Sequence, residues 1–341
     1  MPESNDWKVY YGDGQVDPSR LQNLPDPPPW RNFGNLAQVR GSNFKIPPGV
    51  VEVVNAALYL RRPILVTGDP GVGKSSLAFS IAHELGLGRV LSWNINSRST
   101  LTEGLYQYDA IARLRDASFE QRGRESAPHS ASTPAAEGRE RRQKIEDIGR
   151  YIKLGPLGTA YASTDKPRVV LVDEIDKSDI DLPNDLLHVF EDGEFEIPEL
   201  VRMADASPEV RVSTSEVDAA NAARTVTVKN GLVQCTIFPI VVITSNGERE
   251  LPPAFLRRCL RVDIPKPDPK QLEEIAKAHL PAADAAVLAS LIAEFDRRRT
   301  EGATLATDQL LNLFFLISRG KPIANEDRAV LEPALLRDLN R

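Results

Sequence analysis

A glycine-rich run at residues 66–76 has the residue types that bind a phosphate group. The run is VTGDPGVGKSS, and its centre fits the pattern G-x-x-x-x-G-K-[ST]. Glycines allow the backbone to curl so that several N–H groups point into one concavity, and the positive end of a following helix attracts the anion. The sequence therefore predicts a loop that holds the phosphates of a nucleotide.

Each position of this loop has an expected role. Lys74 is expected to reach the β- and γ-phosphates, and the Ser75 hydroxyl is expected to ligate Mg²⁺. A chance match in a glycine turn is the alternative, but an apolar run ends at Gly68 and a helical pattern starts at Lys74. The predicted nucleotide-binding residues are Gly68, Asp69, Pro70, Gly71, Val72, Gly73, Lys74, Ser75 and Ser76.

A pair of acidic residues follows another apolar run, in the stretch VVLVDEIDK. Doubly wound sheets place ligands at the C-terminal edge of their strands, where this pair would lie. Asp173 is expected to hold Mg²⁺ through water, and Glu174 is expected to orient or deprotonate the attacking water. The alternative is that the pair only caps a helix. The adjacent glutamate favours hydrolysis of the γ-phosphate over its transfer to a bound acceptor.

Three further polar residues lie near the ends of later runs. Asn246 ends the stretch ITSN and is expected within reach of the γ-phosphate or the attacking water, unless it only caps the strand. Arg257 and Arg258 precede the last apolar run, and an arginine against the γ-phosphate stabilises the charge of the transition state. Surface arginines are more often solvated or paired with acids, so the residues alone leave both interpretations open.

The elements that must position these side chains are short apolar runs, each the length of a buried parallel strand. Helical patterns separate the runs, which indicates βαβ crossovers. We therefore expect an α/β fold with a doubly wound, five-stranded parallel sheet. The runs are PILVTG (63–68), RVLSWNI (89–95), RVVLVDE (168–174), FPIVVITSN (238–246) and CLRVDIP (259–265).

Three domains are expected along the chain. Residues 1–47 are rich in proline and predict an extended arm, in which Trp7, Tyr10, Tyr11 and Trp30 pin the arm to a folded surface. Residues 48–266 hold the predicted sheet and its site. Residues 267–341 carry helical patterns and predict a small helical domain.

Two connections within the sheet domain are too long for a simple crossover. The first covers about residues 96–160, and its small, polar and charged residues predict a disordered loop near 120–142. The second covers about residues 193–237, where the alternation in TVTV and the KNG turn predict a β-hairpin.

Taken together, these motifs resemble an AAA+ ATPase, and more closely the MoxR branch, within the clade that has a helix-2 insert and a hairpin before sensor 1. The matching stretches are GDPGVGKS (Walker A), GPL at 155–157, LVDEIDKS (Walker B), TSN (sensor 1) and LPPAFLRRC. The resemblance covers about residues 45–340. Walker A alone occurs in many P-loop enzymes, whereas this ordered set with a helical lid is far more specific.

The resemblance implies a ring, usually of six subunits, in which ATP and Mg²⁺ bind between the α/β domain and the lid. It also implies an arginine finger from the neighbouring subunit, which by register is Arg258, with Arg257 as the alternative. MoxR relatives commonly act on von Willebrand factor A domain proteins, and some belong to bacterial defence or conflict systems. A protein client of this kind is therefore expected.

Within the insert, the resemblance places Tyr106 and Tyr108 near the ring pore, while packing beneath the insert is the equal alternative. The insert also carries a basic cluster, which is more typical of a solvated loop than of a docking patch. Its members are Arg139, Arg141, Arg142 and Lys144.

One position departs from the family pattern. MoxR relatives usually carry a sensor-2 arginine in the lid, but the matching position in GATLATDQLLNL is Asp308. An acid beside a triphosphate would repel it. The run Arg297, Arg298 and Arg299 offers a substitute, although a solvated charge run is the more usual interpretation.

The bulk properties fit a cytoplasmic ATPase. No apolar run is long enough to cross a membrane, no signal peptide is apparent, and Cys235 and Cys259 lack metal-ligand spacing, so reduced thiols are expected. The net charge of −6 argues against general attraction to nucleic acid.

Three alternatives to a protein remodeller stay open at this point. The first is a nucleic-acid motor of the restriction type, which would favour GTP and which the basic insert keeps open. The second is a nucleotide-gated assembly switch with slow turnover, which the acid at position 308 favours. The third is a P-loop kinase for a small molecule, against which Glu174 and the helical lid argue.

Overall fold

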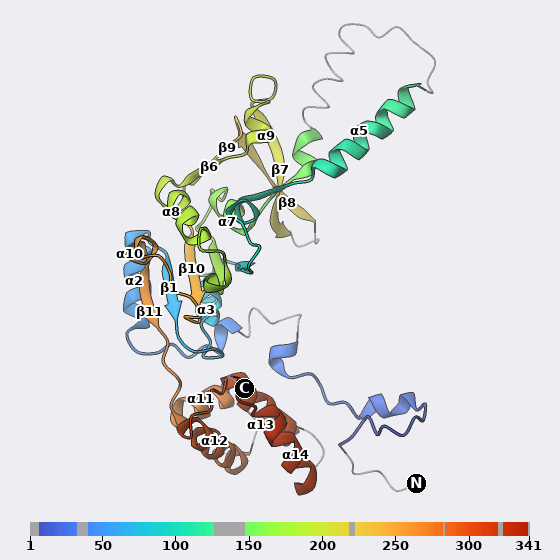
Figure 1. Cartoon of the computed structure of the whole chain (residues 1–341), viewed down its shortest axis with the longest axis vertical. Helices are drawn as coiled ribbons and strands as arrows, with labels where there is room; N and C mark the ends of the chain where they lie inside the picture. The colour runs from blue at the N-terminus through green and yellow to red at the C-terminus, as the bar shows by residue number, and fades with distance from the viewer. Residues whose placement is uncertain are drawn as a thin grey trace. The chain divides into compact units, whose positions relative to one another are not determined.

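The computed structural model describes residues 7–32, 40–125, 147–217, 222–281, 284–319 and 323–339. The chain divides into two compact units, which are described separately (Figure 1). One unit contains Met1–Pro48, Thr67–His83 and Asp263–Arg341, and the other contains Gly49–Val66 and Glu84–Val262. The basic cluster at 139–144 and most of the predicted disordered loop lie outside the described residues, and residues 120–125 are the end of a helix.

A five-stranded parallel sheet has the order β11-β1-β10-β5-β2, and each strand coincides with one of the five predicted apolar runs. The predicted doubly wound α/β fold class is therefore confirmed. Strands β11, β1 and β10 are labelled in Figure 1. The strands are β1 (Ile64–Thr67), β2 (Leu91–Asn94), β5 (Val169–Asp173), β10 (Ile240–Ser245) and β11 (Leu260–Asp263).

The central strands are apolar because neighbours cover both of their faces. Every residue of β10 is buried, and β5 is buried up to Asp173 at its end. β5 pairs in parallel with β10 on one side and with β2 on the other, where Asn94 lies opposite Asp173. Since the strands are parallel, their carboxyl ends share one edge of the sheet, which is the edge where the polar motifs begin.

A second, six-stranded sheet has the order β3-β4-β7-β8-β9-β6 and joins the two long connections. The first connection supplies two strands and the second supplies four. Strands β7 and β8 pair antiparallel, and β8 pairs with β9 across the turn at Asn230 and Gly231, which the KNG motif marks. The strands are β3 (Tyr106–Tyr108), β4 (Ile152–Leu154), β6 (Glu194–Glu196), β7 (Glu209–Val217), β8 (Ala223–Lys229) and β9 (Leu232–Gln234).

Short helices connect the two sheets into one apolar core. Tyr161 at the end of α7 is fully buried, and its hydroxyl donates to the Val189 carbonyl oxygen at 2.7 Å. The same core contains Phe255 of α10 and Trp93 of β2. The helices of this unit are α2 (Val50–Leu60), α4 (Leu101–Leu105), α5 (Ala110–Glu125), α7 (Pro156–Tyr161), α8 (Leu182–Asp192), α9 (Pro198–Val201) and α10 (Pro253–Arg258), with 3-10 turns η3 (Asp147–Tyr151) and η4 (Ile175–Lys177).

The other unit holds the N-terminal arm, the glycine-rich loop and the C-terminal helices, which have a core of their own. Phe295 and Phe314 are fully buried in that core, and Trp30 of the arm packs against it. The elements are η1 (Pro18–Asn23), η2 (Pro29–Arg31), α3 (Ser76–Glu84), α11 (Pro269–His279), α12 (Ala285–Thr300), α13 (Thr307–Arg319) and α14 (Asn325–Leu335).

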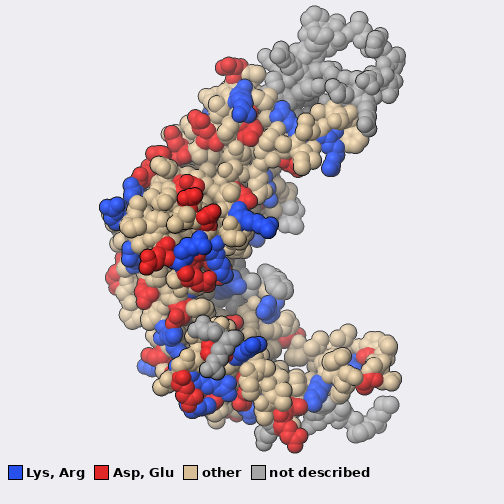
Figure 2. All heavy atoms as spheres, viewed as in Figure 1, with Lys and Arg blue, Asp and Glu red and all other residues tan. Residues whose placement is uncertain are grey.

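The surface mixes both signs of charge. On the face shown in Figure 2, Lys and Arg side chains alternate with Asp and Glu side chains and form no continuous basic stripe. None of the helices in the described residues is long and apolar enough to cross a membrane. Both cysteines are free thiols, and burial raises the pKa of the Cys259 thiol to about 12.

Candidate nucleotide site

The glycine-rich loop, residues 68–75, is folded around the side chain of Lys74. This lysine is only 7 % exposed, and its ammonium donates to the carbonyl oxygens of Gly68 at 2.7 Å and Asp69 at 2.8 Å. Helix α3 follows directly, since the Ser76 amide donates to the Gly73 carbonyl oxygen. The loop thus places one buried cation at the positive end of a helix, which is the electrostatic requirement for holding an anion.

Glycine is required at three positions of the loop, because each has a positive φ: 142° at Gly68, 77° at Gly71 and 93° at Gly73. A Cβ atom added to Gly68 would lie 2.5 Å from the Ile264 carbonyl oxygen, and one added to Gly71 would lie 2.3 Å from the Ala306 Cβ atom. The backbone is therefore curled, and it has no room for a side chain at Gly68 or Gly71, as is usual in a phosphate cradle. These features fit a nucleoside triphosphate.

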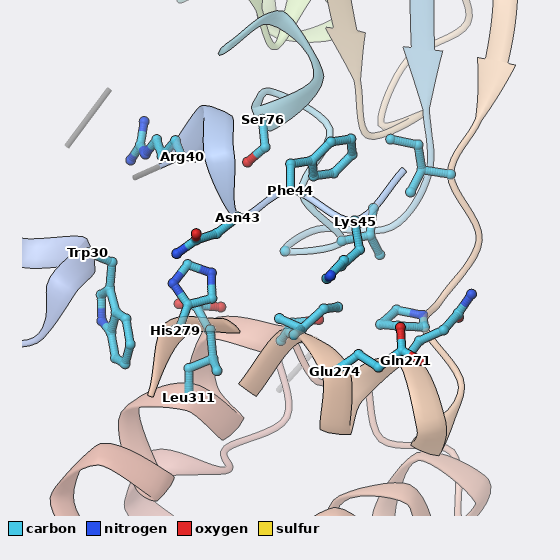
Figure 3. Close-up of a pocket in the computed structure, with 18 of the residues that line it drawn as sticks. Trp30, Arg40, Asn43, Phe44, Lys45, Ser76, Gln271, Glu274, His279 and Leu311 are labelled. Carbon is cyan, nitrogen blue, oxygen red and sulfur yellow. The ribbon is translucent and has the colours of Figure 1, made fainter. Parts of the chain in front are cut away.

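A cavity of about 540 Å³ opens beside the loop and lies wholly within this unit. Its size falls in the range of small-molecule sites. Its lining includes the arm around residues 43–47, the loop at Gly71–Gly73 with Ser76, the stretch 264–267, and helices α11 and α13. Figure 3 shows Phe44 and Ser76 on one side of the cavity and His279 and Glu274 on the other.

The arm contributes aromatic and polar groups to the cavity that the loop lacks. The Trp30 Nε1 atom donates to Asn312 Oδ1 at 2.9 Å, and the Trp30 ring meets His279 edge-on with centroids 5.8 Å apart. Burial lowers the pKa of His279, and its Nδ1 atom is buried without a hydrogen-bond partner in the part of the chain that the structure describes. Arg40 and Lys45 supply positive charge to the lining.

Asp308 of α13 lies at the loop. It lines the cavity, and a Cβ atom on Gly71 would be 3.4 Å from Asp308 Oδ1. The upstream arginines have partners within the lid instead. Arg297 and Arg298 pair with Glu294, and Arg299 donates to the Pro267 carbonyl oxygen at 2.9 Å.

The predicted acidic pair lies in the other unit, at the end of β5. Thr244 of β10 connects the two acids: its hydroxyl donates to Asp173 Oδ1 at 2.6 Å and accepts from the Glu174 backbone amide at 2.8 Å. Glu174 has a φ of 63°, which is strained for a residue with a side chain. Its carboxylate pairs with Lys177 at 2.8 Å and stays partly exposed.

The loop after β10 is fixed to the same turn by Asp176. This carboxylate is only 3 % exposed, and its Oδ2 atom accepts from the backbone amides of Asn246 at 2.9 Å and Glu248 at 3.0 Å. The Asn246 side chain donates to Glu248 Oε1 at 3.2 Å. Asn246 is therefore held through Asp176 to the same turn that carries the acidic pair.

The remaining candidates make contacts within their own unit. Arg258 at the end of α10 pairs with Glu191 of α8, whereas Arg257 is exposed. The Tyr106 hydroxyl donates to Glu199 at 3.0 Å. Burial, and to a lesser extent this hydrogen bond, raises the pKa of the Tyr106 hydroxyl to about 12. Tyr108 accepts from Arg113, and both tyrosines pack against the core, which is the packing alternative for these residues.

A parallel sheet of this order, with a glycine-rich loop after β1 and paired acids after β5, defines a P-loop nucleotide-binding domain. The family model of the AAA domain, dynein-related subfamily, matches residues 63–259, which is more than half of the 341-residue chain. The chain belongs to this family and carries the ATPase domain of AAA+ proteins. No curated protein matches the chain.

Sequence reasoning missed two groups of this site. Thr244 lies inside the motif ITSN, where only the last residue was assigned a role. Asp176 lies inside DEIDK, where only the first two acids were assigned roles. Trp30, Asn43 and Asn312 reach the cavity through packing between distant segments. A third acid, two residues after the pair, is the local signal that points to Asp176.

Proposed function

We propose that this protein hydrolyses ATP at the glycine-rich loop. The observation that carries the proposal is the cavity beside Gly71 and Gly73: it continues the phosphate cradle with a pocket large enough for a nucleoside. The apolar part of the lining, including Phe44, Ile46 and Leu311, suits a base, and the polar groups around it suit a ribose.

The chemistry follows from the types and places of the side chains. Lys74 binds the phosphate oxygens, while Ser75 and Asp173 are the residues that would hold Mg²⁺. Magnesium, when bound, neutralises charge on the phosphates. Glu174 orients the attacking water and accepts its proton, and Asn246 orients the water or the γ-phosphate. Strand β1, which leads into the loop of Lys74, and strand β5, which ends at Asp173, belong to one parallel sheet, and this supports the action of both residues on the same nucleotide.

We further propose that the active form is a ring, usually of six subunits, of the MoxR-like type. Arg258 then completes the site of a neighbouring subunit as the arginine finger. Hydrolysis would remodel or activate a protein client, and a von Willebrand factor A domain protein in a bacterial defence or conflict system is the class that the sequence resemblance implies. The mixed charge on the face shown in Figure 2 and the net charge of −6 support a protein client over a nucleic-acid track.

The proposal is tested with Glu174→Gln, which keeps the shape of the side chain and removes the base. We expect ATP binding to persist and turnover to fall by roughly two to four orders of magnitude. Glu250→Gln, at an exposed residue outside the turn, is the matched control and should turn over normally. Normal turnover in Glu174→Gln would refute the assigned base.

Two further measurements separate the parts of the proposal. Lys74→Ala should abolish ATP binding, since the phosphates lose their buried cation. Adding duplex DNA to the wild-type protein should leave the rate of hydrolysis unchanged, and a strong stimulation would favour the nucleic-acid motor. Light scattering of Glu174→Gln with ATP measures the number of subunits in the assembly.

A further inference from the structure

Hydrogen bonds connect the turn after β5 with strand β10 and the loop that follows it, and each of the two segments contributes one side chain to these bonds. Strand β10 contributes the Thr244 hydroxyl, which contacts the Asp173 carboxylate at 2.6 Å and the Glu174 amide at 2.8 Å. The turn contributes the Asp176 carboxylate, which binds the amides of Asn246 and Glu248. We call Thr244 and Asp176, with these four bonds, the clamp.

Both members of the clamp are buried, so water does not compete for their bonds. Thr244 is 1 % exposed and Asp176 is 3 % exposed. A buried carboxylate is costly unless it is hydrogen-bonded, and charge-assisted bonds to backbone amides are among the stronger ones. Asp176 Oδ1 has no partner among the described residues, so the two amide bonds carry the compensation alone.

The clamp acts on the backbone where that backbone is strained. Glu174 adopts a φ of 63°, and its amide is held by Thr244 in this conformation. Strain of about 1–3 kcal/mol persists only where surrounding bonds impose it. A strained backbone that is held by a buried hydrogen bond is typical of a residue whose side chain must keep one orientation.

We propose that Thr244 and Asp176 are positioning residues that hold Glu174 and Asn246 in a fixed relative geometry for hydrolysis. This inference rests on the proposed roles of Glu174 and Asn246. Neither clamp residue needs to contact the nucleotide. Thr244 sets the direction of the Glu174 side chain and of the Asp173 carboxylate, and Asp176 sets the backbone from which the Asn246 side chain extends.

The direct test is Thr244→Val, which keeps the shape of the side chain and removes both bonds. We expect kcat to fall by about 10- to 100-fold, the usual effect of losing an orienting partner, while the dissociation constant for ATP stays within about 2-fold. Thr244→Ser restores the hydroxyl and should recover most of the rate. Equal loss of rate in the valine and serine variants would overturn the role of the hydroxyl.

A matched control separates positioning from stability. Thr214 of β7 is also buried, at 5 % exposure, and its hydroxyl donates to the Arg224 carbonyl oxygen at 3.1 Å. Thr214→Val should lower the midpoint of thermal unfolding as Thr244→Val does but leave kcat unchanged. A similar fall of kcat in both variants would overturn the clamp and indicate a general loss of stability.

The Asp176 half is tested with Asp176→Asn, which keeps an acceptor oxygen but loses the charge. We expect an intermediate fall of kcat at unchanged ATP affinity, and the same variant serves if Thr244→Val does not fold. Glu174→Gln, measured in parallel, distinguishes the two levels of inference. If Glu174→Gln is inactive while Thr244→Val and Asp176→Asn keep full kcat, the clamp is refuted and the proposed function stands; if Glu174→Gln is fully active, the proposed function fails.

Discussion

The Asp308 carboxylate lies beside Gly71 of the phosphate loop, close enough that a Cβ atom on Gly71 would be 3.4 Å from Asp308 Oδ1. Both residues line the cavity. Helix α13 therefore presents an acid next to the place where phosphates are expected to bind. The acid also lies in the first turn of α13, where the helix dipole favours it.

The first prediction concerns this acid. Asp308→Asn should tighten ATP binding by about 3- to 10-fold at low salt, because it removes repulsion of the triphosphate, and the gain should shrink as salt is added. It should also lower the stability of α13 slightly, since a favourable charge leaves the first turn. Titration calorimetry measures the affinity.

Glu326→Gln makes the same change of charge at an exposed residue of α14 and serves as the control. It should alter neither the ATP affinity nor its dependence on salt. A weaker affinity in Asp308→Asn would mean that the acid assists binding, and the repulsion argument would then be wrong.

The second prediction concerns Gly71. Gly71→Ala should weaken ATP binding by more than about 10-fold, because the new methyl group meets the Ala306 Cβ atom at 2.3 Å and the φ of 77° is unfavourable for alanine. Gly86→Ala is the control, since Gly86 has a φ of 62° but no atom within 4 Å of its Cβ position. Equal effects of the two variants on affinity would show that crowding at the loop has no part.

The parallel sheet was predictable because its strands are continuous apolar runs. Strands covered on both faces leave a signal in the local sequence, and the polar residues that follow β5 and β10 stand out against it. The glycines of the phosphate loop were predictable for a related reason. Their positive φ values exclude other residues, so the motif and the backbone conformation are two forms of one constraint.

The second sheet and the cavity were not predictable in this way. Strand β4 joins β7 across more than fifty residues of chain, through the single pairing of Lys153 with Ser213, and no local pattern specifies such a register. Trp30 reaches α13 through side-chain packing and one hydrogen bond to Asn312. Contacts between distant segments depend on the folded geometry, which the apolar pattern alone does not contain.

The third prediction concerns the attachment of the arm to the lid. Trp30→Phe should loosen the arm by about 1 kcal/mol, because it loses the bond to Asn312 but keeps an aromatic ring against Phe315. Limited proteolysis of the arm measures this loosening. Asn312→Ala removes the same bond from the other side, so the double variant should be no worse than either single one. Additive effects would argue against a shared bond.

The fourth prediction is a pH dependence that arises at His279. Burial lowers the pKa of this histidine below its ordinary value of 6.5, so the unfolded chain binds its proton more readily than the folded chain. The contribution to stability is therefore complete above pH 6.5 and is lost as the pH falls through the lower, folded pKa. Thermal unfolding across this range measures the loss.

His279→Phe keeps a ring against Trp30 and removes the titrating group, so the stability of this variant should fall less between pH 7 and about pH 5. His188→Gln, at an exposed residue of α8, should leave the wild-type pH dependence in place. The explanation fails if the His279→Phe profile follows the wild-type curve throughout.

The last prediction concerns Arg258, which pairs with Glu191 within its own subunit. This contact lowers the pKa of Glu191 and competes with any contact that Arg258 makes to a neighbour. If Arg258 acts in trans, Glu191→Gln should free it and lower the protein concentration that gives half-maximal ATPase activity. Arg258→Ala should be inactive alone, yet mixing it with Lys74→Ala subunits should restore part of the activity, because each variant then supplies what the other lacks. Arg257→Ala, at the exposed neighbour, should retain activity; a loss there, with no rescue at any mixing ratio for Arg258→Ala, would transfer the role to Arg257.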